Sequence, residues 1–398
     1  MSSRVPEFKN KAIILGVPVN DRPMNFFVEK IDNALIKNKQ LRIYTPNPEI
    51  CLKAEKNENY LHVLERADFN LPDGIGLKLG AKILGEKLKN RVTGADLTRR
   101  LLEKYQYQKI KIFIVLRHNS LTGKSDLKKM FQEKYPQINF QAEKLNPEDL
   151  NNCDNLLNKI NDFQPDIIFT TLGAPEQEIW IDKYLSWLPK TKIALAVGGS
   201  FDFLTGQIKR APKALSKSGL EWLYRFYQEP KRLKRVKNAT VDFLLTCHRW
   251  KERMNKKYRQ NAVAVVKNQN NKFLIIKNPR FKNHWQFPQG GIELGEKPEK
   301  GVIRELSEEV GASKKLFKII KKIPEQHRYD WPDYAKKIKG YKGQKQSAYL
   351  IQYLGTNRQM DLKKSFEAEK IKWVKKQDLK KLIHHHRQEL LKKILTHI

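Results

Sequence analysis

The sequence has few cysteines and no long apolar run. The first twenty residues also lack the apolar core and cleavage signature of a secretory leader. No stretch reaches the roughly 18 apolar residues that a transmembrane helix needs. We therefore expect a protein of the reducing cytoplasm that, if it meets a membrane, lies on its surface. The three cysteines are too dispersed for a disulfide framework or a cysteine zinc site: Cys51, Cys153 and Cys247.

The charge is strongly of one sign. Lysine and arginine together number 78, aspartate and glutamate together 43, and the net charge is +35. Such an excess favours polyanionic partners, namely nucleic acid, nucleotides or an anionic membrane surface. A proteome rich in lysine would give the same net charge without any functional role. Composition therefore leaves open whether the charge is functional or only compositional.

Residues 1–236 alternate continuous apolar runs with amphipathic stretches. Continuous apolar strands separated by helices are typical of a parallel sheet covered on both faces. We therefore expect an α/β, Rossmann-like domain with a parallel sheet. The runs expected as strands are KAIILGV, LRIYT, KIKIFIVL, PDIIFTTLG and KIALAVGG, and FFVEKIDNALIKN and PEQEIWIDKYLSWL are expected as helices.

The pattern changes after Pro230. Residues 237–257 form a basic connector with one apolar island, VDFLL, which either lies on a membrane surface or packs in a core. Residues 258–398 are rich in strands around one clear helix, which predicts an α+β domain with its own core. We expect its last helix over LKKLIHHHRQELLKKIL.

The most specific motif of the chain runs from Gly290 to Ala312. It follows the spacing G-x5-E-x7-R-E-U-x-E-E-x-G-U, where U is an apolar residue, with Arg304 before the acidic triple. On a helix, residues at i, i+3 and i+4 share one face, so their carboxylates repel unless a cation neutralises them. Hard oxygen ligands of this kind suit Mg²⁺ or Mn²⁺. The predicted ligands are Glu305, Glu308 and Glu309.

This motif resembles that of the Nudix hydrolases, which hydrolyse a nucleoside diphosphate linked to another group. The resemblance implies metal binding by the three glutamates, with Glu308 and Glu309 catalytic, and orientation of the carboxylates by Arg304. WQFPQGGI, the Tyr258-Arg259-x-Asn261 segment and GQKQ are similar to the branch of RNA 5′-pyrophosphohydrolases and diadenosine polyphosphate hydrolases. That branch implies substrate contact by Arg259 and a catalytic glutamate, Glu367, although Glu369 is an alternative two residues away.

Short polar motifs follow the strand-like runs of residues 1–236. In open α/β sheets a ligand lies outside the carboxyl ends of the strands, so we expect these loops to converge. Each motif alone is more typical of a turn or a helix cap. The ordered set comprises Thr45-Pro46-Asn47, Asp73-Gly74, Arg91 to Asp96, Gly173 to Glu178, and Gly198 to Asp202.

This ordered set resembles the TagA/WecG/CpsF family of bacterial glycosyltransferases. The resemblance implies inverting transfer of an N-acetylmannosamine-type sugar from UDP to a polyprenyl-diphosphate-linked N-acetylglucosamine, with no metal cofactor in this domain. Asp73 matches the general base, and Thr45 and Asn47 would position the sugars. Further substrate-binding residues implied are Arg91, Asp96, Gln177, Glu178 and Asp202, with Arg225, Arg232 and Arg235 on the diphosphate.

These resemblances predict a bifunctional enzyme at the inner face of the cell membrane. Its partners would be a UDP-sugar, a polyprenyl-linked acceptor, and a nucleotide or RNA 5′ end. Homo-oligomerisation stays open. So does an alternative in which one domain is catalytic and the other only binds nucleotide or RNA.

Overall fold

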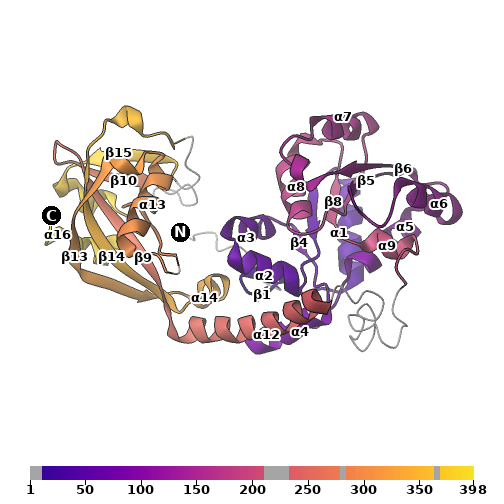
Figure 1. The fold of residues 1–398 in the computed structure, drawn as a ribbon, viewed down its shortest axis with the longest axis horizontal. Coiled ribbons are helices and arrows are strands. Elements are labelled where there is room, and N and C mark those ends of the chain that lie inside the picture. Colours follow the sequence, from indigo (N-terminus) through magenta and orange to yellow (C-terminus); the bar gives the residue numbers. More distant parts are fainter. Residues whose placement is uncertain (1–10, 210–232, 278–283, 294, 363–367) are drawn as a thin grey trace. The chain divides into compact units, whose positions relative to one another are not determined.

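The strands build two large sheets and one two-stranded hairpin, and the chain divides into two units, each around one of the large sheets (Figure 1). The computed structural model describes residues 11–209, 233–277, 284–293, 295–362 and 368–398, without the side chains of 233–239 and His386. The larger unit comprises Pro6–Lys251 and Lys337–Lys339, and the smaller unit comprises Glu252–Lys336 and Gly340–Ile398.

The larger unit is built on a six-stranded sheet in the order β4-β3-β8-β7-β5-β6. All of its strand pairs are parallel, which confirms the predicted α/β class. Its strands are β3 (Leu41–Tyr44), β4 (Phe69–Asn70), β5 (Lys111–Arg117), β6 (Asn139–Leu145), β7 (Ile167–Thr170) and β8 (Ile193–Ala196).

Helices cover both faces of this sheet, which explains why its central strands are apolar throughout. Apolar residues of α1, α5 and α6 pack against one face, and α7 and α8 lie on the other (Figure 1). The helices are α1 (Met24–Ile36), α2 (Pro48–Lys56), α3 (Glu58–Glu65), α4 (Ile75–Leu84), α5 (Gly94–Tyr105), α6 (Lys124–Lys134), α7 (Asp154–Phe163), α8 (Glu176–Tyr184) and α9 (Ser200–Leu204), with short 3₁₀ turns at Pro147–Asp149 and Leu185–Trp187.

The run KAIILGV does not join the parallel sheet, which corrects our prediction for it. Its residues form β1 (Lys11–Ile14) and the start of β2 (Val17–Asn20), which pair as an antiparallel hairpin. Leu15 and Gly16 have φ angles of 50° and 88°, respectively. Two consecutive positive φ angles suit a tight hairpin turn, and the apolar pattern alone did not reveal it.

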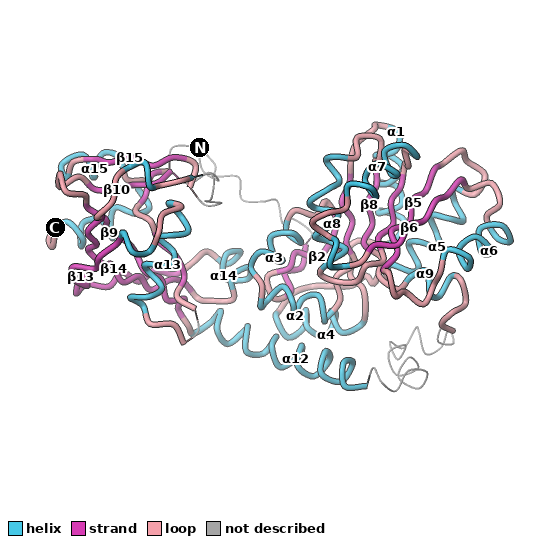
Figure 2. Tube along the Cα trace, turned by 45° about the horizontal axis from the view of Figure 1, so that its top comes forward, coloured by secondary structure: helices cyan, strands magenta, loops and turns pink. Residues whose placement is uncertain are grey.

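The basic connector lies within one long helix, α12 (Leu233–Lys256). The island VDFLL is split between two faces of that helix. Phe243 is fully buried, whereas Val241 and Leu245 are 49% and 48% exposed. A Cβ atom on Gly80 of α4 would lie 2.6 Å from the Phe243 ring and 3.1 Å from the Cys247 sulfur. The inner face of α12 therefore packs closely on α4, and Figure 2 shows these two helices side by side.

The smaller unit holds a mixed sheet in the order β11-β10-β9-β14-β13, with β12 on β9 and β15 on β10. Strands β9 and β14 are parallel and the other pairs are antiparallel, so the predicted α+β fold is confirmed. Its elements are β9 (Tyr258–Lys267), β10 (Phe273–Lys277), β11 (Trp285–Gln286), β12 (Gln289–Gly291), α13 (Pro298–Val310), β13 (Phe317–Asp330), α14 (Asp333–Lys339), β14 (Gly343–Tyr353), β15 (Lys370–Val374), α15 (Leu379–Leu382) and α16 (Gln388–Leu395), with 3₁₀ turns at Lys314–Leu316, Asn357–Gln359, Lys376–Asp378 and His385–Arg387.

Two apolar clusters lie on opposite faces of this mixed sheet. Ala262 and Ala264 pack with α13, whereas Val263 and Val265 pack with α16. The expected last helix is interrupted, because α15 ends at Leu382 and α16 begins at Gln388. Among the helices of the described ranges, none is long and apolar enough to span a membrane.

Gly80→Ala should weaken the contact between α4 and α12. An alanine in a helix is normally favoured over glycine by about 1 kcal/mol. Here the added methyl group meets the Phe243 ring, and overpacking of this kind costs about 1–3 kcal/mol. Hydrogen exchange over residues 240–251 should therefore accelerate. Leu79→Ala, at a 46% exposed neighbour, is the matched control, and equal exchange in both variants would contradict the packing.

Candidate functional site

In the larger unit, the predicted loops meet at the carboxyl edge of the parallel sheet. The Thr45 hydroxyl, after β3, donates to the Ala196 carbonyl of β8 at 2.9 Å. A Cβ atom on Gly94, at the start of α5, would lie 3.3 Å from the Ser200 hydroxyl and 3.4 Å from the Thr45 side chain. Loops that are distant in the sequence therefore lie in contact at this edge.

Asp73 lies among these loops, half-buried between β4 and α4. Its Oδ2 accepts a hydrogen bond from the Gly94 N–H at 3.2 Å. Its own N–H donates to the Pro46 carbonyl at 3.0 Å. Because a helix N-terminus favours negative charge, the first turn of α5 supports the ionised carboxylate. Gly74 has a φ of 104°, which lets the chain turn directly into α4.

Two other predicted residues cap helices. Asn47 is the N-cap of α2, and its side chain accepts from the Ile50 N–H at 2.9 Å. Thr93 is the N-cap of α5, and its hydroxyl donates to Asp96 Oδ2 at 2.7 Å. Arg91 precedes this cap and is half-buried. Capping accounts for the residue types found here, and substrate contact by Asn47, Arg91 and Asp96 stays a prediction.

Gln177, in the first turn of α8, holds the loop that follows β8 by a side-chain hydrogen bond. Gln177 is 2% exposed, and its Oε1 accepts from the Gly198 N–H at 3.1 Å. Its Nε2 donates to Glu178 Oε1 at 2.7 Å. Glu178 itself is 0% exposed and also accepts from the Tyr60 hydroxyl at 2.9 Å. Glu178 is thus enclosed by Gln177 and Tyr60 and has no contact with solvent.

Burial dominates the electrostatics of Glu178. It raises the pKa of the Glu178 carboxyl to about 7, against the hydrogen bonds from Gln177 and Tyr60, which lower that pKa. Asp202 anchors a further loop, since its Oδ1 accepts from the Thr122 hydroxyl at 2.7 Å. Arg225 and Arg232 lie outside the described residues. Arg235 lies on α12, where its side chain is not described.

The acidic triple of the smaller unit lies on α13. Glu309 is 3% exposed, and its Oε2 accepts from the Gln289 N–H at 2.9 Å. Glu305 packs against Gly290 so closely that a Cβ there would lie 1.9 Å from Glu305 Oε2. The Glu308 side chain is 60% exposed. Two carboxylates therefore turn toward the loop before the helix and one toward solvent.

Arg304 contacts three glutamates of the motif. Its Nη2 lies 2.9 Å from Glu296 Oε2, and its Nη1 lies 2.9 Å from Glu305 and 3.4 Å from Glu308. The hydrogen bond from Arg304 is the main reason that the pKa of Glu296 falls to about 2. Charge-assisted bonds of this kind fix the side chains that they join.

The donor chemistry of the triple fits a hard divalent cation, because all its side-chain donors are carboxylate oxygens. Gly290 also leaves the space that Glu305 occupies. In the part of the chain that the structure describes, however, no three acidic, histidine or cysteine side chains are arranged to hold an ion. The residues therefore suit a metal, but this conformation does not bring them together as a formed site.

Side chains of the branch-specific segments form one polar cluster beside α13. The Asn261 amide donates to the Gly290 carbonyl at 2.8 Å. Gln346, 1% exposed, donates to Gln289 Oε1 at 2.7 Å. A Cβ atom on Gly291 would lie 2.5 Å from the Arg259 guanidinium. Residues from β9, β12 and β14 are thus brought together next to the acidic helix.

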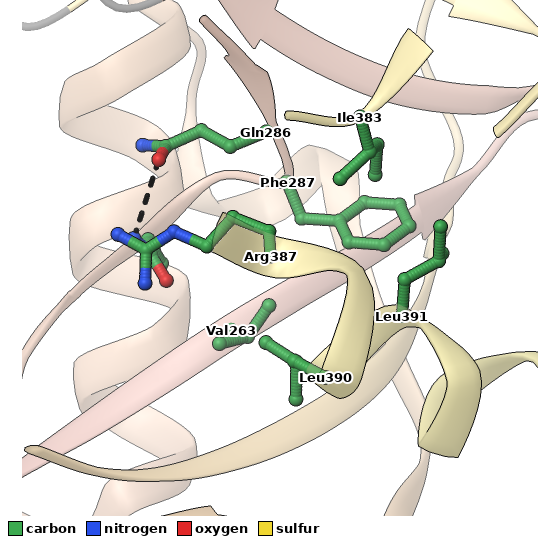
Figure 3. A pocket seen from close by; sticks show the side chains of 8 residues that line it. Val263, Gln286, Phe287, Ile383, Arg387, Leu390 and Leu391 are labelled. Carbon is green, nitrogen blue, oxygen red and sulfur yellow. Dashed lines mark hydrogen bonds between the residues drawn. The ribbon is translucent and has the colours of Figure 1, made fainter. Parts of the chain in front are cut away.

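No motif of the sequence points to Arg387, which lines a small cavity on the α16 face of the sheet (Figure 3). The cavity also touches Gln286, Gln289 and Val263. Arg387 Nη1 donates to the Tyr329 hydroxyl at 3.1 Å, and its buried Nε has no hydrogen-bond partner among the described residues. The other residues that line the cavity are apolar, and the sequence surroundings of Arg387, HHHRQ, match no motif.

Two further predictions concern the carboxyl-terminal region. Glu367 lies outside the described residues. Its alternative, Glu369, precedes β15 and lies 2.8 Å from the Lys277 ammonium group.

Two protein-family models match this chain, in ranges that meet at residues 257–258. The family model described as Glycosyl transferase WecG/TagA/CpsF family matches residues 12–258, more than half of the chain. The family model of the NUDIX domain matches residues 257–394. An N-acetylglucosaminyldiphosphoundecaprenol N-acetyl-beta-D-mannosaminyltransferase of Bacillus spizizenii is 33% identical over 217 residues, covering 54% of this chain and 82% of that protein. The Staphylococcus aureus (strain MW2) protein of that name is 31% identical over 233 residues, covering 58% and 90%.

Among solved structures, an Ap4A hydrolase binary complex of C. elegans is 23% identical, covers 35% of this chain and 96% of that chain, and has a TM-score of 0.28. The dihydroneopterin triphosphate pyrophosphohydrolase of E. coli is 16% identical, covers 35% and 99%, and has a TM-score of 0.30.

Arg304→Gln should raise the pKa of Glu296 from about 2 toward its ordinary value of 4.5, because the largest cause of the lowering is removed. The carboxyl ¹³C shift of Glu296, followed by NMR against pH, measures this. The ionised Glu296 contributes to the free energy of unfolding, and this contribution is lost as the pH falls from 4.5 to about 2. The Arg304→Gln variant should therefore lose less stability than the wild-type protein over this pH range. Lys314→Gln removes only a weaker, coulombic cause and is the control. An unchanged midpoint in Arg304→Gln would refute the pairing.

Proposed function

Because the chain belongs to the WecG/TagA/CpsF family of glycosyl transferases, we propose that residues 1–236 transfer N-acetylmannosamine from UDP, with inversion. The acceptor is an N-acetylglucosamine on a polyprenyl diphosphate, as the name of the Bacillus spizizenii relative indicates. The observation that carries this proposal is the meeting of the Thr45, Asp73, Gly94 and Ser200 loops at one sheet edge.

In this proposal Asp73 is the general base. Its carboxylate takes the proton of the acceptor hydroxyl while that oxygen attacks the anomeric carbon and UDP departs. The Gly94 N–H, at 3.2 Å, holds the carboxylate in place. Thr45 and Asn47 position the sugars, and Gln177 and Asp202 shape the nucleotide loops. Arg225, Arg232 and Arg235 neutralise the leaving diphosphate without a metal, since guanidinium groups bind phosphate oxygens with paired donors.

The chain also carries a Nudix domain, which we propose hydrolyses a nucleoside diphosphate linkage, in RNA 5′-triphosphate or a dinucleoside polyphosphate. Glu305, Glu308 and Glu309 would hold Mg²⁺ or Mn²⁺, which supplies phosphate neutralisation and an activated water. Arg304 would orient these carboxylates, Arg259 would contact the substrate, and Glu367 or Glu369 would assist in catalysis.

The competing proposal is that one domain catalyses and the other only binds nucleotide or RNA. Nothing in the two carboxylate sites favours loss of either activity, because Asp73 and the acidic triple are both present and both supported by hydrogen bonds. We therefore favour two activities.

A crossed pair of variants tests the two activities. Asp73→Asn keeps the shape but removes the base, so transfer should fall by roughly 10²–10⁴-fold while hydrolysis persists. Glu308→Gln should abolish metal-dependent release of phosphate or pyrophosphate while transfer persists. Each variant is the control for the other. If either substitution reduced both activities equally, the proposed division of 1–236, 237–257 and 258–398 would be wrong.

We also propose that the outward face of α12 lies on the inner surface of the cell membrane, where a polyprenyl-linked acceptor resides. Val241 and Leu245 are exposed there, beside the cationic Arg249, opposite the buried Phe243. Exposed apolar groups can enter the acyl boundary while cations meet anionic headgroups.

Co-sedimentation with vesicles tests this surface. Wild-type protein should bind anionic vesicles at low salt and release as salt screens the charges, since each cation contributes about 1 kcal/mol. Leu245→Asp with Arg249→Glu should abolish binding, whereas Lys190→Glu, an exposed change far along the sequence, should not. Failure of the wild-type protein to bind anionic vesicles at low salt would exclude the surface.

A further inference from the structure

Glu178 is buried beneath the loops to which the proposed transferase site belongs, and it touches no solvent. Its two oxygens are both hydrogen-bonded, to the Gln177 amide at 2.7 Å and to the Tyr60 hydroxyl at 2.9 Å. A buried carboxylate is costly unless its acceptors are satisfied in this way. The group therefore does not meet substrate, and its effect must pass through its partners.

Gln177 transmits that effect because an amide has two unlike ends. Its Nε2 must donate to the carboxylate, which leaves its Oε1 to accept from the Gly198 N–H at 3.1 Å. A flipped amide would direct an N–H group against the Gly198 N–H. An ionised Glu178 therefore fixes the one amide orientation that holds the loop at Gly198 and Gly199.

We propose that Glu178 is a positioning residue of the nucleotide-binding edge, holding the Gly198 loop through the orientation of the Gln177 amide. This proposal rests on the proposed transferase function for its link to UDP, but the clamp itself is a property of the buried residues. When Glu178 gains a proton it becomes a donor that can meet Gln177 Oε1. Either orientation of the amide then finds a partner at Glu178, so the hydrogen bond to the Gly198 loop is weakened.

The clamp should respond to pH near neutrality, because burial raises the pKa of Glu178 to about 7. Below that pH the carboxyl is protonated and the clamp is weakened, and above it the clamp is set. The hydrogen bond from Tyr60 lowers the pKa of Glu178, so loss of that hydroxyl must move the midpoint upward. Other titratable and charged groups facing this cluster are Tyr44 on β3, Cys51 and Lys53 on α2, and Glu176 and Asp182 on α8.

Selective [¹⁵N]glycine labelling of the full chain reads the clamp directly through the Gly198 amide. In the wild-type protein its shift should titrate with a midpoint near pH 7. Tyr60→Phe should move this midpoint to higher pH, and Glu178→Gln should remove the titration. A merely structural carboxylate would alter stability without moving the Gly198 midpoint, so unfolding midpoints are measured in parallel. Tyr60→Phe is conservative enough to keep the test valid if Glu178→Gln fails to fold.

The affinity for UDP connects the clamp to function. In the wild-type protein UDP should bind less tightly below pH 7 than above it, and Glu178→Gln should bind it roughly 5- to 30-fold more weakly at pH 8, the effect of losing one or two kcal/mol. A Gly198 amide that does not titrate, or that titrates unchanged in Tyr60→Phe, overturns the clamp. A titrating Gly198 in a protein that binds no UDP upholds the clamp and instead contradicts the proposed transferase function.

Discussion

The single direction of the six strands in the larger unit is the constraint on which its site depends. Parallel strands end at one edge, so every loop that leaves a carboxyl end is delivered to the same place. Thr45 after β3, Asp73 after β4 and Gly198 after β8 meet there without lying near one another in the sequence. Buried side chains beneath this edge, above all Gln177, then join the loops to each other.

The smaller unit meets a different demand, since it must hold several carboxylates on one helix. Arg304 neutralises part of that charge and fixes Glu296 and Glu305, while the backbone N–H of Gln289 donates to Glu309. Glycines at 290 and 291 make the approach possible, because any side chain there would overlap Glu305 or Arg259. In both units a backbone N–H group thus holds a carboxylate: Gly94 donates to Asp73, and Gln289 donates to Glu309.

Much of this organisation could be predicted from the sequence, because apolar runs without alternation specify buried parallel strands and the acidic spacing specifies a helix face. The hairpin at 11–20 could not, since its turn depends on positive φ angles at Leu15 and Gly16 rather than on apolar content. The burial of Glu178 could not be predicted either. Its position after a strand, beside Gln177, is typical of a pocket residue, but the packing of α3 places Tyr60 against it. The surroundings of Arg387 could not be predicted, because they come from three segments far apart in the chain: Val263, residues 286–289 and residues 383–391.

The central claim is that the meeting loops of the larger unit transfer a sugar, and do not merely bind or hydrolyse its nucleotide. The most direct measurement supplies UDP-N-acetylmannosamine, labelled in the sugar, and a synthetic polyprenyl-diphosphate N-acetylglucosamine, with chelator present to silence metal-dependent hydrolysis. The account predicts that the label moves into a lipid-linked disaccharide as UDP is released in equal amount. Consumption of the donor with all label in water-soluble sugar, or no consumption at all, would contradict it.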